Sequence, residues 1–97
     1  MRYEIILLPK AMEDLRRLDA HMRSTVRSAL EVHLRYEPMK VSRSRIKRLR
    51  GLAQPQYRLR VGELRVFYDV TEEKVEVLAI LSKPMVEQWL RETGRPS

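Results

Sequence analysis

The chain has 97 residues, of which 43% are hydrophobic, and this is enough for one small domain with a single core. It contains no cysteine, which excludes disulfide bonds, thiolate catalysis and cysteine-based zinc sites. Twenty lysine and arginine residues against thirteen acidic residues give a net charge of +7, which favours a polyanion such as nucleic acid as the partner over a basic surface that only aids solubility.

The first half of the chain predicts a short strand followed by two helices. Residues 3–8 form an apolar run that fits a buried strand, and Pro9 suits the first turn of the helix that follows. We expect this helix to extend from Pro9 to about His21, and a second helix, capped by Ser24 or a neighbour, to reach Tyr36. The apolar run is too short to span a membrane and no secretory signal is visible, so we expect a cytoplasmic protein.

The second half contains three alternating segments that predict strands: residues 57–61, 64–68 and 74–82. Gly62 and Glu63 join the first two as a two-residue hairpin loop, with glycine first as a type II′ turn prefers. Residues 39–45 form a basic loop, residues 45–51 only weakly indicate a strand, and residues 84–93 predict a short terminal helix.

The order of predicted elements, β-α-α-β-β-β-α, indicates an α+β domain that spans residues 1–97. We expect a mainly antiparallel four-stranded sheet with the helical hairpin packed on its apolar face. The opposite face should stay open to solvent or ligand. Strict alternation in the last strand places four side chains on one face: Val75, Val77, Ala79 and Leu81.

The predicted hairpin gathers arginines on one face. Alternation puts Arg58, Arg60, Arg65 and Phe67 opposite the apolar face, with Lys83 near the end of the next strand. Arg60 and Arg65 would stand directly opposite each other, which destabilises a strand pair by about 0.2–1 kcal/mol. Three fixed guanidinium groups would bind a phosphodiester and stabilise charge that develops on it. The alternative is a solvated face on which Arg58 stacks against Phe67.

Other candidate site residues give weaker indications of function. His21 and His33 are well separated on the predicted helices and neither has a nucleophile partner. No spacing of metal ligands and no glycine-rich phosphate loop is present. Trp89, the one tryptophan, predicts either a core residue of the terminal helix or a platform on which a base stacks.

Taken together, these residues resemble the RelE/ParE superfamily of toxins from type II toxin–antitoxin systems. The resemblance covers roughly residues 1–90 and rests on the element order and on three segments: KRLRG (47–51), YRLRVGELRVFYDV (57–70) and VEVLAILSK (75–83). The chain is more similar to the RelE branch, whose members cut mRNA in the A site of the ribosome. This implies the RelE-like microbial RNase fold, with a short terminal helix.

The RelE-type pattern implies five catalytic positions: Arg58, Arg60, Arg65, Lys83 and Trp89. The ribose 2′-OH would attack its own 3′ phosphate, with no metal and no other cofactor. RelE has lysines where this chain has Arg58 and Arg60, and a tyrosine where it has Trp89, so the resemblance implies phosphate binding more directly than proton transfer. Further basic residues are expected to contact RNA or the ribosome: Arg43, Arg45, Lys47, Arg48 and Arg50.

The resemblance also implies partners. These are the ribosome with its mRNA, and an antitoxin, RelB-like or similar, whose acidic or amphipathic segment covers the arginine face and displaces the terminal helix. Two alternatives stay open, a ParE-like inhibitor of DNA gyrase and a degenerate relative that only binds its antitoxin.

Overall fold

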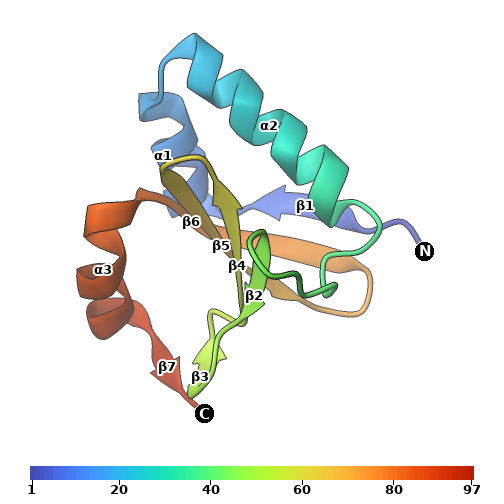
Figure 1. The fold of residues 1–97 in the computed structure, drawn as a ribbon, viewed down its shortest axis with the longest axis vertical. Helices are drawn as coiled ribbons and strands as arrows, with labels where there is room; N and C mark the ends of the chain where they lie inside the picture. Colours follow the sequence, from blue (N-terminus) through green and yellow to red (C-terminus); the bar gives the residue numbers. More distant parts are fainter.

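The computed structural model describes residues 1–97 and contains two sheets (Figure 1). The main sheet has five strands in the order β1-β6-β5-β4-β2, and only its β1–β6 pair is parallel. Its strands are β1 (Glu4–Leu7), β2 (Ile46–Arg48), β4 (Tyr57–Val61), β5 (Leu64–Val70) and β6 (Lys74–Ser82). A second, two-stranded sheet pairs β3 (Leu52–Gln54) with β7 (Arg95–Pro96).

Helices cover both faces of the main sheet. The hairpin of α1 (Pro9–Arg17) and α2 (Ala20–Leu34) packs on one face, and the terminal segment of η1 (Lys83–Met85) and α3 (Val86–Thr93) packs on the other (Figure 1). The predicted α+β order is confirmed, with β2 as a fifth strand of the sheet and β3–β7 as an additional pair. No helix has both the length and the apolar character needed to cross a membrane.

The boundary between the first two helices differs from the expectation. The first helix ends at Arg17 rather than near His21, and the second begins at Ala20. The cap is Asp19, whose carboxylate accepts a hydrogen bond of 2.8 Å from the Met22 amide, whereas Ser24 lies inside the helix. Aspartate is among the preferred N-cap residues because its short side chain satisfies an otherwise free amide.

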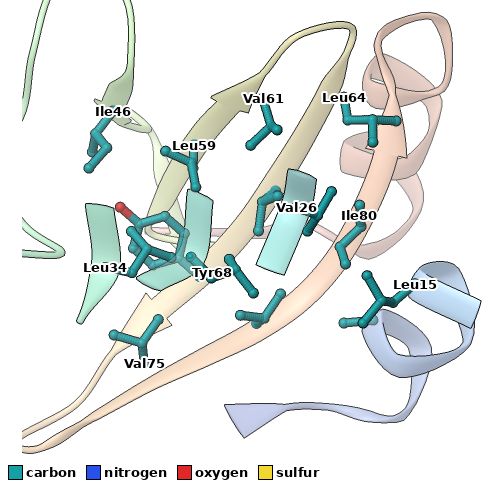
Figure 2. Close-up of a cluster of buried hydrophobic side chains, with 14 of the residues drawn as sticks. Leu15, Val26, Leu34, Ile46, Leu59, Val61, Leu64, Tyr68, Val75 and Ile80 are labelled. Carbon is teal, nitrogen blue, oxygen red and sulfur yellow. The ribbon is translucent and has the colours of Figure 1, made fainter. Parts of the chain in front are cut away.

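The core fills the space between the helical hairpin and one sheet face (Figure 2). Tyr68 is fully buried there, its hydroxyl donates to the Pro38 carbonyl oxygen at 2.7 Å, and burial raises the pKa of its phenol. Other members of this cluster come from α1, α2, β4, β5 and β6: Leu15, Val26, Leu30, Leu34, Leu59, Val66, Val75, Val77 and Ile80.

A bulge in β6 overturns the strict alternation expected for this strand. Phe67 pairs with Ala79, but the next residue of β5 pairs with Val77, so Leu78 is left over as an extra residue. Ile80 consequently joins Val75 and Val77 on the core face, and Ala79 and Leu81 turn to the opposite face. The bulge thus gives both faces of the sheet buried apolar side chains.

A carboxylate from α1 completes the edge of the sheet beside this bulge. The parallel strand β1 ends at Leu7, so the Ile80 amide has no strand partner on that side. It donates instead to the Asp14 carboxylate at 2.9 Å, which also accepts from Lys10 Nζ at 2.9 Å. Asp14 therefore fixes α1 to the sheet.

Replacing this carboxylate should destabilise the fold. We expect Asp14→Ala to lower the free energy of unfolding by about 1–3 kcal/mol, because a partly buried amide loses its acceptor. Urea denaturation measures the change. The matched control is Glu13→Ala, since Glu13 pairs only with Arg17 on the exposed side of α1, and a loss below about 0.5 kcal/mol is expected there. Equal losses would show that the bond to Ile80 contributes nothing particular.

Candidate functional site

The hairpin of β4 and β5 has the predicted register. Arg60 pairs with Arg65 and Arg58 pairs with Phe67, so all three arginines project from the face opposite the core. Lys83 follows β6 directly, and its amide donates to the Glu63 carbonyl oxygen at 3.0 Å, which holds it beside the hairpin turn. Four cationic side chains thus come from three neighbouring segments.

These side chains line one hollow of about 590 Å³, which we call the arginine pocket. Its lining comes from the loop before β2 and from β2, β4, β5, η1 and α3: Arg43, Ser44, Lys47, Arg58, Arg60, Arg65, Lys83, Val86, Glu87 and Leu90. The structure therefore brings together four of the five residues expected to be catalytic. Two of the expected RNA contacts, Arg43 and Lys47, lie in the same pocket.

The other expected RNA contacts lie beside the pocket. Arg45 lines a small neighbouring hollow together with Arg60, and Arg48 and Arg50 line a hollow that shares Lys47 with the arginine pocket. Arg48 is also committed to the fold, because its Nη1 donates to the Gln56 carbonyl oxygen at 2.7 Å and its guanidinium lies 5.3 Å from the centre of a tyrosine ring.

Within the pocket, Arg65 is held rigidly. Only 8% of it is exposed, and its Nη1 donates to the carbonyl oxygens of Gly62 at 2.8 Å and Leu64 at 2.9 Å. These bonds tie the guanidinium to the hairpin turn. Arg65 therefore stabilises the turn as well as contributing charge.

Arg58 is the least satisfied cation of the cluster. Its Nε is buried without a hydrogen-bond partner. Burial first, and then repulsion from Arg65 and Arg60, lower the pKa of the Arg58 guanidinium. An arginine still stays protonated, so the cost appears as a charge that lacks compensation within the chain.

No carboxylate of the chain neutralises the cluster. Four of the five ion pairs lie outside the pocket: Lys10–Asp14, Arg17–Glu13, Arg35–Glu31 and Lys40–Glu37. The fifth, Arg91–Glu87, involves none of the four cations of the cluster. Asp69 is buried but accepts from Gln54 Nε2 at 2.6 Å and from the Gln56 amide at 2.8 Å. Glu87 is the single carboxylate in the pocket lining, and its nearest cation is Arg91 at 3.9 Å. The arginines are thus available to an external anion.

Trp89 is the expected site residue that the pocket lining does not include. Its ring centre lies 5.1 Å from that of Phe67, with the planes tilted by 39°, and its Nε1 is buried without a partner. Phe67 is fully buried, so Arg58 has no open ring face to stack on. The sheet face is consequently open only over the arginines, because α3 covers the part around Phe67.

The helix α3 is fixed at both ends. It continues from η1 at its start, and beyond its end β7 pairs with β3 while the Ser97 amide donates to the Gly51 carbonyl oxygen at 3.2 Å. Displacement of this helix by a partner would require these contacts to break.

Four lining residues were not anticipated from the sequence: Ser44, Val86, Glu87 and Leu90. The signal for three of them was present, because positions 86, 87 and 90 share one helix face and follow directly after Lys83. Pocket walls built by α3 depend on where that helix packs, which the local pattern does not specify.

Solved structures share this fold. A chain of the archaeal RelE–RelB complex from Pyrococcus horikoshii is similar with a TM-score of 0.70 and 22% identity, covering 86% of this chain and 97% of that one. A chain of the RelBE2 toxin–antitoxin complex from Mycobacterium tuberculosis gives 0.69 and 22%, with coverages of 84% and 99%. The YoeB dimer from Staphylococcus aureus gives 0.61 and 20%, with coverages of 81% and 94%. At such identities the likeness establishes the RelE-like fold.

The sequence comparisons identify the family. No curated protein has significant sequence similarity to the chain. The family model described as the ParE toxin of the type II toxin–antitoxin system parDE matches residues 5–86, which is most of the length of this chain. The chain therefore belongs to the ParE toxin family of type II toxin–antitoxin systems, within the RelE/ParE superfamily that its sequence resembles.

Proposed function

We propose that this type II toxin is a cytoplasmic, ribosome-dependent endonuclease that cleaves mRNA in the A site and stops translation. The observation that carries the proposal is the arginine pocket. Arg58, Arg60, Arg65 and Lys83 line a hollow of about 590 Å³ without an ion pair to any carboxylate of the chain. Such a cluster suits the phosphodiester of a single RNA strand.

The reaction that fits this pocket is attack of a ribose 2′-OH on its own 3′ phosphate. The new bond joins the 2′ oxygen to phosphorus, and the bond from phosphorus to the 5′ oxygen breaks. Negative charge grows on the non-bridging oxygens, where fixed guanidinium donors stabilise the transition state more than the ground state. The ribosome supplies the strand geometry, so cleavage of free RNA is expected to be feeble.

Proton transfer needs groups other than arginine. Guanidinium and indole groups do not exchange protons near neutral pH, and the Tyr68 phenol is buried on the far face of the sheet. Among the lining side chains, the Glu87 carboxylate is suited to accept the 2′-OH proton, and the Lys83 ammonium group is suited to give a proton to the leaving 5′ oxygen.

The partner supported by the solved relatives is an antitoxin, since two of them are complexes of a toxin with its antitoxin. A second candidate function, ParE-like inhibition of DNA gyrase, is favoured by the ParE family match. Both functions are compatible with one fold, so the target must be measured.

Induction in bacteria followed by primer extension on a reporter mRNA tests the nuclease. We expect cuts between codon positions, and we expect Arg58→Gln to reduce them about 100-fold, as the loss of one oxyanion donor typically does. Arg58 is preferable to Arg65 as the test position because the buried Arg65 also holds the turn. Arg27→Gln, an exposed change on α2, is the control.

Growth arrest with intact mRNA and a DNA-damage response would favour gyrase as the target. Antitoxin binding without growth arrest would favour a degenerate relative.

The role of Glu87 has its own test in single-turnover cleavage on programmed ribosomes. We expect Glu87→Gln to lower kcat by about 10²–10⁴, because the proton acceptor is lost. KM should fall as well, because a negative charge near the substrate phosphate is removed. Glu92→Gln, an exposed change on the same helix, should change neither. An unaltered kcat for Glu87→Gln would exclude this residue as the base.

The repulsion within the cluster is measurable without substrate. We expect Arg60→Gln to raise the free energy of unfolding by about 0.2–1 kcal/mol at low salt, because Arg60 directly opposes Arg65. The gain should shrink as sodium chloride screens the charges. Urea denaturation at two salt concentrations measures this, with Arg27→Gln as the control. A gain that is independent of salt would show that repulsion is not its cause.

A further inference from the structure

Exposed apolar side chains gather at the end of α2 and in the segment that follows it. Of the six large apolar residues that are exposed, four lie between positions 32 and 41: Val32 at 75%, Tyr36 at 61%, Met39 at 50% and Val41 at 56%. We call these four residues the 32–41 patch. Single exposed apolar residues are ordinary, but a group within one short segment is typical of a contact surface.

The patch lies between two hollows. Val32 and Tyr36 line one of about 410 Å³, whose lining also includes the buried Ile46. Val41 lines the other, of about 660 Å³, together with residues 47–50. The patch therefore borders two hollows into which apolar side chains of a partner can insert.

Cations surround the patch. They come from both hollows: Lys40, Arg45, Lys47, Arg48 and Arg50. The single carboxylate among the lining residues, Glu37, lies 3.7 Å from Lys40. Burial, and then the charge of Arg45, lower the pKa of His33 in the first hollow, so this histidine stays neutral and adds no further charge. The rim is positive overall and complements an acidic partner.

The patch is continuous with the arginine pocket. Arg45 lines both the first hollow and a smaller one that it shares with Ser44 and Arg60, and these two residues also line the arginine pocket. On the other side, Lys47 lines both the second hollow and the arginine pocket. A chain segment seated on the patch can thus extend directly to the arginines.

Strand addition is not the mode of contact here, although β2 is an edge strand. The outward amide of Ile46 donates to Ser42 Oγ at 3.2 Å, and its carbonyl oxygen accepts from the Ser42 amide at 3.0 Å. The turn before β2 therefore occupies the outward groups of Ile46 and interrupts the row of groups that another strand would need. A contact through side chains is favoured.

We propose that the 32–41 patch is the docking surface for an acidic amphipathic segment of the antitoxin. The apolar side of the segment covers Val32, Tyr36, Met39 and Val41, and its carboxylates reach Arg45 and Arg60 at the entrance of the arginine pocket. This inference rests on the toxin–antitoxin partnership in the proposed function and not on the nuclease activity. A second copy of the chain is a poor occupant because each copy carries a net charge of +7.

A matched pair of methionines tests the proposal. Met39 and Met85 are equally exposed, at 50% and 51%, but Met85 lies outside the patch. The probe is the antitoxin that copurifies with the chain from its native host, titrated calorimetrically. We expect Val32→Ser with Met39→Ser to weaken binding about tenfold or more, and Met85→Ser to leave it nearly unchanged. Because the substituted residues are exposed, the variants should stay folded, and circular dichroism verifies this.

Two further readouts, light scattering and mRNA cleavage, decide the remaining outcomes. Unchanged antitoxin binding by the double variant overturns the proposal. So does a free toxin that light scattering finds to be dimeric and that the double variant makes monomeric, since the occupant is then a second copy. A double variant that loses mRNA cleavage while it binds antitoxin normally assigns the patch to RNA and also overturns the proposal. A wild-type chain that cleaves no mRNA but follows the expected binding pattern rejects the nuclease and supports the docking surface.

Discussion

The register of the β4–β5 hairpin is the constraint on which both the core and the site depend. Side chains alternate along a strand, so one register sends Leu59, Val66 and Tyr68 to the core and the three arginines to the other face. A slip by one residue would bury guanidinium groups and expose the apolar set. The turn fixes this register. A type II′ turn requires a positive φ at its first central residue, and Gly62 has a φ of 57°. No residue other than glycine has a positive φ in this chain. Arg65 then bonds to the carbonyl oxygen of Gly62 and reinforces the turn from the site itself.

Residue patterns predicted this hairpin because its two faces differ sharply in polarity. The same reasoning was wrong in β6, where Leu78, Ala79 and Ile80 are all apolar and alternation carries no information about a bulge. It was also wrong at Asp19, because the apolar spacing continues across the two helices and conceals the cap. The β3–β7 pair joins strands of three and two residues from distant parts of the chain, a length at which no periodicity exists.

The same distinction applies to the arginine pocket. Its cations were predictable because they occupy alternating positions of strands, and strands fix the direction of a side chain. Its remaining walls come from the placement of α3, which follows from the contact of Trp89 with Phe67 and from the pairing of the chain end with β3. In the structure, Trp89 acts on the site through this packing on Phe67.

One electrostatic feature governs both proposed partners. The uncompensated arginines attract a phosphodiester and an acidic peptide for the same reason, so charge alone discriminates poorly between mRNA and antitoxin. Screening weakens charge interactions beyond about 8 Å at physiological ionic strength, so attraction between exposed groups is also limited in range. An apolar contact has neither limitation, because RNA presents no aliphatic side chains and burial of apolar area is insensitive to screening. In the proposed docking, the 32–41 patch supplies what the arginine pocket lacks, a means of recognising a protein segment. A segment that reaches Arg60 from the patch would also exclude mRNA from the pocket, which would explain how its binding silences the toxin.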